Sequence, residues 1–133
     1  MREIKFRAWD KESKRILNIA RFDFADHTVY SHLFACDGYL AENLKIMQYT
    51  GLKDKNGTEI YDGDIVKFND FWSEITGGNV GDTIRTCFVE YIMSGFFLRD
   101  VLDEEYEEDL GMALINDDEF EVIGNIYEHP HLI

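Results

Sequence analysis

Proline, cysteine and long apolar runs are scarce in this chain of 133 residues. The single proline, Pro130, lies near the end, so proline interrupts no strand before it. Cys36 and Cys87 are too few for a disulfide framework, although one bridge between them stays open. No window approaches the roughly 18 apolar residues of a membrane helix, and no leading apolar run resembles a signal peptide. We therefore expect a soluble cytoplasmic protein.

Basic residues are also scarce, but only in the second half of the chain. From Met1 to Val66, 10 Lys/Arg stand against 11 Asp/Glu, whereas from Lys67 to Ile133 only 3 stand against 16. This balance disfavours a generic duplex-DNA binder, because neutralising phosphates requires a dense basic surface. It favours a partner that is itself basic.

Length and composition predict one domain over residues 1–133. Hydrophobic residues make up 45% of the chain and aromatic residues 14%, which is enough to bury a core at this length. The sequence shows no internal repeat and no linker.

Alternating apolar residues predict several strands. Ile4, Phe6 and Ala8 alternate with charged residues, the period of a strand with one buried face, and residues 16–19 could return as the second arm of a hairpin. Residues 83–93 form the longest strand candidate. Both of its faces are largely apolar, which indicates a central strand.

Glycine turns predict how these strands bend. Asn56-Gly57 is typical of a type I′ hairpin turn, and Asp62-Gly63 repeats the signal five residues later. Two turns so close together favour a strongly bent sheet over residues 50–91, similar to an SH3-like barrel, with the N- and C-terminal strands packed onto it. Residues 71–82, which are rich in glycine, read as a loop.

Two segments have helical spacing. Residues 39–49 favour a short helix or turn followed by a strand. Through the acidic stretch, apolar residues recur at helical spacing and predict a short helix with one apolar stripe: Leu102, Tyr106, Leu110, Ala113 and Leu114. The expected fold class is therefore mainly β, a β-rich α+β fold with one or two short helices.

Carboxylates are concentrated in that same stretch. From Asp100 to Glu121 there are 11 acidic residues and no Lys or Arg. If the apolar stripe turns inward, the carboxylates cover an exposed face that either meets a basic partner or only keeps the protein soluble. The candidate partner-binding residues are Asp103, Glu104, Glu105, Tyr106, Glu107, Glu108 and Asp109.

The N-terminal strand supports an alternative. Its basic residues lie among aromatic ones and could form a small surface for single-stranded nucleic acid: Lys5, Arg7, Lys14 and Arg15 with Phe6 and Trp9. Ion pairs between these Lys and Arg side chains and the acidic half of the chain are the simpler explanation for the basic residues.

The sequence contains little that supports a motif for catalysis or metal binding. A calcium loop with Gly57 at its sixth position lacks both defining carboxylates. His129 and His131 have no third ligand nearby in sequence, so we expect a solvated tail. No nucleophile elbow or phosphate-binding loop occurs. We therefore predict no enzyme activity, no cofactor and no metal.

Three segments carry a family resemblance: MREIKFRAWDKESKRIL at the start, QYTGLKDKNGTEIYDGDIVKF from Gln48 to Phe68, and EVIGNIYEHPHLI at the end. Together they resemble the YopX family of phage and prophage proteins. The resemblance implies a small β-rich protein in the cytoplasm of a bacterial host, and it supplies no site residues. The histidines of the closing segment depart from the more acidic or amide-bearing tail expected of the family.

These observations lead to one functional prediction. We expect a non-catalytic accessory protein that binds a basic host or phage protein through its acidic face. A nucleic-acid-binding module that uses the N-terminal strand is the alternative, and a homo-oligomer stays open.

Overall fold

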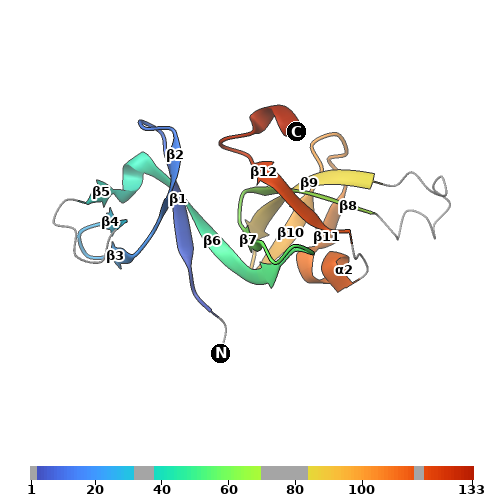
Figure 1. Ribbon diagram of the computed structural model, residues 1–133, viewed down its shortest axis with the longest axis horizontal. Helices are drawn as coiled ribbons and strands as arrows, with labels where there is room; N and C mark the ends of the chain where they lie inside the picture. Colours follow the sequence, from blue (N-terminus) through green and yellow to red (C-terminus); the bar gives the residue numbers. More distant parts are fainter. Residues whose placement is uncertain (1–2, 32–37, 70–83, 116–118) are drawn as a thin grey trace. The chain divides into compact units, whose positions relative to one another are not determined.

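The computed structural model describes residues 3–31, 38–69, 84–115 and 119–133 (Figure 1). The chain divides into two compact units, Met1–Tyr49 and Thr50–Ile133. That the whole chain acts as one domain stays a prediction. Across the described parts of the chain, none of the helices is both long and apolar enough to cross a membrane.

The first unit contains two small antiparallel sheets. Its elements are β1 (Phe6–Asp10), β2 (Arg15–Asn18), β3 (Arg21–Asp23), β4 (Thr28–Tyr30), β5 (Tyr39–Leu40), the 3-10 helix η1 (Ala41–Asn43) and β6 (Leu44–Lys53). One sheet has the order β2-β1-β6-β7, in which β6 continues past Tyr49 and β7 (Glu59–Tyr61) belongs to the second unit. The other sheet has the order β3-β4-β5. The predicted N-terminal strand, its hairpin return and the short helix followed by a strand over residues 39–49 are confirmed.

The core of the first unit follows from the alternation along β1. Ala8 is fully buried and lies opposite Leu17 of β2 and Ile46 of β6. Val29 of β4 and Leu44 pack in the same cluster. The inner face of the β2-β1-β6 sheet is thus covered by the β3-β4-β5 sheet.

The second unit contains the larger, strongly curved sheet (Figure 1). Its elements are β7 (Glu59–Tyr61), β8 (Asp64–Asn69), β9 (Ile84–Ile92), β10 (Gly95–Arg99), β11 (Glu107–Asp109), α2 (Leu110–Ile115), β12 (Glu121–Asn125) and η2 (Pro130–Leu132). The five-stranded sheet has the order β11-β10-β9-β8-β12. Hence the mainly β fold is confirmed and β9 is central as predicted, whereas the C-terminal strand, β12, is an edge strand of the sheet itself. The curved sheet extends to residue 125, beyond the predicted limit of residue 91.

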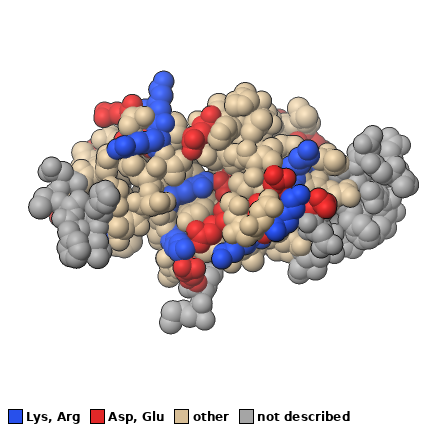
Figure 2. All heavy atoms as spheres, in the orientation of Figure 1, with Lys and Arg blue, Asp and Glu red and all other residues tan. Residues whose placement is uncertain are grey.

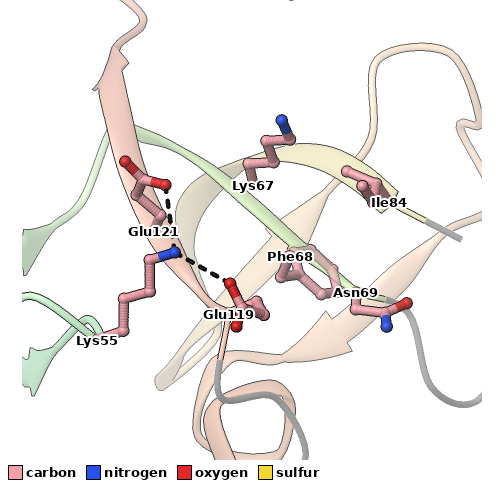
Figure 3. A pocket seen from close by; sticks show the side chains of 7 residues that line it. All are labelled: Lys55, Lys67, Phe68, Asn69, Ile84, Glu119 and Glu121. Atoms are coloured by element: carbon pink, nitrogen blue, oxygen red, sulfur yellow. Dashed lines mark hydrogen bonds and ion pairs between the residues drawn. The ribbon is translucent and has the colours of Figure 1, made fainter.

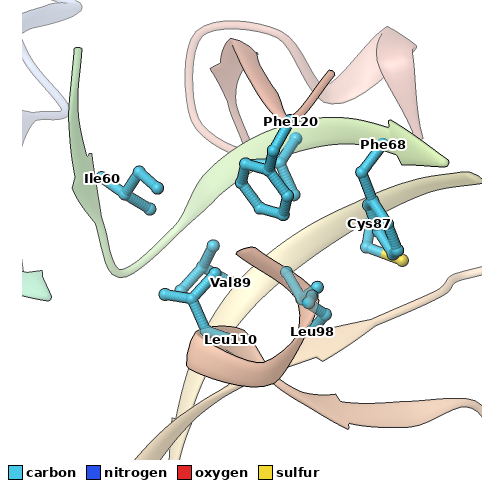
Figure 4. Packing of buried hydrophobic residues seen from close by; sticks show 9 residues of the cluster. Ile60, Phe68, Cys87, Val89, Leu98, Leu110 and Phe120 are labelled. Carbon is cyan, nitrogen blue, oxygen red and sulfur yellow. The ribbon is translucent and has the colours of Figure 1, made fainter. Parts of the chain in front are cut away.

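One hydrophobic cluster fills the inside of this sheet (Figure 4). Its buried members are Ile60, Val66, Phe68, Cys87, Val89, Leu98, Leu110, Ala113 and Phe120. The rings of Phe68 and Phe120 stack with their centroids 5.5 Å apart. Cys87 is fully buried, as expected for a small apolar side chain. Cys36 and the predicted loop over residues 71–82 lie outside the described residues.

The turn at Asn56-Gly57 differs from the type I′ prediction. Gly57 has a φ of +79°, but Asn56 does not adopt a positive φ. The reason is Asp54, whose Oδ1 accepts the backbone N–H groups of both Asn56 and Thr58 at 2.9 Å. This side chain satisfies the backbone of the turn itself, so the left-handed geometry is needed at only one position.

Asp54 also joins this hairpin to the last strand. Its Oδ2 accepts the backbone N–H of Val122 at 2.9 Å, and the carbonyl of Phe120 accepts the N–H of Lys55 at 3.1 Å. The Asp54 residue is only 8% exposed. The hairpin therefore covers the outer edge of β12, where unpaired backbone groups would otherwise face solvent.

The second glycine turn, at Asp62-Gly63, forms a corner rather than a hairpin. Its flanking strands, β7 and β8, belong to different sheets. Gly63 has a φ of +88° and donates its N–H to the carbonyl of Val89 at 2.8 Å. Asp64, which is 1% exposed, accepts the N–H of Tyr61 at 2.8 Å. These bonds fix the turn at the point where the chain passes between sheets.

The short helix predicted through the acidic stretch is present, but only over the last part of the predicted apolar stripe. Leu102 is 96% exposed, residues 107–109 form β11, and α2 covers only residues 110–115. Aspartate side chains take the backbone donors that a helix would use: Asp100 accepts from Leu102 and Asp103 from Glu105. Asp109 accepts the N–H of Met112 at 3.1 Å, so the helix begins only there.

Candidate functional site

The acidic segment, residues 100–109, is held to the sheet by Arg85 of β9. The guanidinium lies 2.8 Å from Asp100 Oδ2 and 3.7 Å from Asp103 Oδ2. It also lies over the ring of Tyr106, 3.9 Å from the centroid. The Arg85 and Asp100 side chains are only 21% and 10% exposed, so solvent screens this pair weakly.

A second set of contacts holds the end of the acidic segment. Arg99 of β10 lies 2.8 Å from Glu107 Oε2, across the pairing of β10 with β11. The Tyr106 hydroxyl donates to Glu108 Oε2 at 2.6 Å. Together with Asp109 at the start of α2, most of the predicted partner-binding residues thus make contacts inside the unit.

The exposed part of the acidic segment combines charge with apolar surface. Val101 and Leu102 are 48% and 96% exposed. Glu104 and Glu105 are exposed beside them. On the face of the molecule that Figure 2 presents, Lys and Arg side chains are interspersed with Asp and Glu. The distinctive feature of the acidic segment is therefore an exposed apolar pair followed by carboxylates.

The basic N-terminal strand is engaged in local contacts. Lys5 pairs with Glu3 at 3.1 Å, and Arg15 donates to the Tyr39 hydroxyl at 3.3 Å. Trp9 is half-buried. Nucleic-acid binding by this strand stays a prediction.

A recess lies at the end of the second sheet, where β8 ends and β9 begins (Figure 3). Its volume is about 230 Å³, and it is lined by Lys55, Lys67, Phe68, Asn69, Ile84, Glu119 and Glu121. Lys55 Nζ lies 3.1 Å from Glu119 Oε2 and 3.7 Å from Glu121 Oε2. The hydrogen bond to Glu119 raises the pKa of the Lys55 amine above its ordinary value, so the amine stays charged.

The sequence does not point to this recess. Its residues come from the hairpin, from β8 and β9, and from β12 with the residue pair before it, and only the antiparallel pairing of these strands brings them together. Lys67 lies opposite Thr86 on one side and Glu121 on the other. The one usable signal is the scarcity of basic residues after Val66, which makes Lys67 conspicuous.

The C-terminal tail is more ordered than the expected solvated tail. His129 is half-buried, and its Nδ1 accepts the backbone N–H of Asn125 at 3.2 Å. The Asn125 side chain accepts the N–H groups of Tyr127 and Glu128. A Cβ at Gly124 would lie only 2.6 Å from His129 Nδ1, so glycine allows the ring to pack there. His129 thus has a structural role, whereas His131 is exposed.

Comparisons with known proteins place the chain in a family. No curated protein matches it. A solved structure described as "Crystal structure of protein EF1440 from Enterococcus faecalis" is 27% identical, with 99% of each chain covered and a TM-score of 0.64. The model of the YopX protein family matches residues 5–133, nearly the whole length. The chain therefore belongs to the YopX family.

Proposed function

We propose that this chain is a non-catalytic accessory protein of a phage or prophage, acting in the cytoplasm of the bacterial host by binding a basic protein partner. The binding surface is the exposed part of the acidic segment, Val101 to Glu105. The observation that carries this proposal is Leu102, an apolar side chain that is 96% exposed and flanked by carboxylates.

The conformation of this segment supports binding. Asp100 and Asp103 accept backbone N–H groups within the loop, and Arg85 contacts both carboxylates. A loop that is ordered before binding loses less conformational entropy when a partner docks. The contacts within the loop therefore hold Leu102 in a defined position, although its side chain is not buried.

Charge and apolar contact would have separate roles in the complex. Glu104 and Glu105 would attract a basic surface and speed the encounter, an effect that salt screens. Leu102 would enter an apolar pocket of the partner and supply affinity that depends less on salt. A partner with basic residues around an apolar depression fits both features.

Affinity copurification from a bacterial host at low and raised salt, followed by mass spectrometry, tests the proposal. We expect a basic partner that is retained at low salt and reduced at raised salt. Leu102→Ser should weaken its capture about tenfold or more. Met93→Ser is the matched control, because Met93 is also 96% exposed but lies at the tip of the β9–β10 hairpin.

A second pair of variants separates charge from apolar contact. Glu104→Gln with Glu105→Gln should slow association and reduce the salt dependence, whereas Glu12→Gln with Glu42→Gln on the first unit should not. Equal capture by the wild type, Leu102→Ser and the double glutamine variant would contradict the proposed surface. Retention of nucleic acid instead of protein would favour the alternative function.

A further inference from the structure

The recess at the end of β8 has one wall with an excess of negative charge. Two carboxylates, Glu119 and Glu121, share the single Lys55 ammonium. This group of three side chains therefore carries one net negative charge. The Glu119 and Glu121 side chains are 75% and 43% exposed, so both carboxylates face solvent.

A positive charge stands apart from this group. Lys67 lines the recess, but its amino group is separate from the Lys55 cluster (Figure 3). Considering only residues 3–31, 38–69, 84–115 and 119–133, Lys67 makes no ion pair. The recess as a whole is thus neutral, with its negative and positive charges at different places on its lining.

The rest of the lining provides an apolar surface large enough for a small apolar group of a ligand. Ile84 is 62% exposed beside the recess, and the ring of Phe68 forms part of its buried base. The volume of about 230 Å³ exceeds the roughly 150 Å³ cavity that admits a benzene molecule in another protein. A ligand with a single small apolar group and two charged ends would therefore fit.

From this arrangement we propose that the recess binds a small zwitterion with an apolar side chain, of the class of free branched or aromatic α-amino acids. Its carboxylate pairs with Lys67, and its ammonium pairs with Glu119 and Glu121. Its apolar side chain packs against Ile84 and Phe68. This site is distinct in its residues from the acidic segment, so either proposal can fail without the other.

Titration of the full chain, labelled with ¹⁵N, with leucine and phenylalanine tests the inference by NMR. At about 10 mM ligand, we expect amide shifts at Lys67, Ile84 and Glu121 that saturate with a dissociation constant in the millimolar range or below. Two leucine analogues act as probes of the charges: N-acetylleucine lacks the ammonium, and leucinamide lacks the carboxylate. Each should bind about tenfold more weakly than leucine.

Variants assign each end of the ligand. Lys67→Met should weaken leucine binding about tenfold and make leucine and leucinamide bind alike, since neither then finds a carboxylate partner. Lys53→Met, a change of the same type at an exposed position on β6, should leave binding unchanged. The same spectra report whether each variant is folded.

Three results would overturn the inference. They are no saturating shifts with either amino acid, equal binding of leucine and its two analogues, and unchanged binding by the folded Lys67→Met variant. Shifts that appear equally in Lys53→Met and wild type but vanish in Lys67→Met would support it.

Discussion

The second unit contains two turns that have the same type of hydrogen bond but different roles. They are the hairpin at residues 54–58 and the loop at residues 100–106. In each, an aspartate accepts backbone N–H groups a few residues ahead: Asp54 in the hairpin, Asp100 and Asp103 in the loop. The hairpin aspartate is 8% exposed and also binds the backbone of β12. The loop leaves Leu102 almost wholly in solvent.

This difference shows that net charge alone does not identify a binding surface. The carboxylate of Asp54 is used to close the sheet against its last strand, and those of Asp100 and Asp103 are used to shape a loop. What remains for a partner is set by neighbouring side chains, here Arg85, rather than by the number of acidic residues.

Removing the hairpin aspartate should have the largest effect. Asp54→Ala leaves three backbone N–H groups without their acceptor, those of Asn56, Thr58 and Val122. We expect a loss of about 3 kcal/mol in the free energy of unfolding, measured by urea denaturation. Asp103→Ala, in the exposed loop, is the control and should cost under about 1 kcal/mol. Equal losses of unfolding free energy in the two variants would show that the two aspartates contribute equally to stability.

Releasing the loop should have a smaller effect. Arg85→Met removes the pair with Asp100 and the contact with the Tyr106 ring while keeping an apolar stem. We expect a loss of about 1–2 kcal/mol, because both side chains of the pair are mostly buried. Amide exchange at Leu102 and Glu105 should become faster, whereas exchange at Asn56 should not change. Unchanged exchange at Leu102 would mean that the loop is held by other contacts.

A third aspartate turn, at the β1–β2 hairpin, provides a test by pH. The Ser13 hydroxyl donates to Asp10 Oδ2 at 2.7 Å, and this bond is the largest cause that lowers the pKa of Asp10 below its ordinary value of 3.8. A lowered pKa contributes stability that is present above about pH 4 and is lost as pH falls through the folded-state value. Ser13→Ala should therefore be less stable than wild type at neutral pH. That difference should shrink below about pH 4, and a difference that grows on acidification would contradict this assignment.

Much of the fold could be predicted because its signals are local. The alternation in Phe6–Asp10 and the apolar character of both faces of residues 84–92 predicted β1 and the central strand. The helical spacing of Leu102 was misleading, because nearby aspartates compete for the backbone N–H groups that a helix requires. The bond from Val122 to Asp54 could not be predicted, since 68 residues separate its partners.

The candidate site could be predicted only in part. The acidic residues were found from composition, but the arginines that engage them come from β9 and β10 and become neighbours only through strand pairing. Only three basic residues follow Val66, and two of them, Arg85 and Arg99, contact the acidic segment.

The smallest effect on stability, and the sharpest test of what distinguishes the loop, comes from its exposed glutamates. Glu104→Gln with Glu105→Gln removes two charges from side chains that lie in solvent beside Leu102. We expect the free energy of unfolding to change by less than about 0.5 kcal/mol, because exposed charges contribute little to folding. Thermal and urea unfolding of this variant, compared with Asp54→Ala, measure the contrast directly. A loss similar to that of Asp54→Ala would mean that these glutamates support the fold, and they would then be unsuited to serve as a surface reserved for a partner.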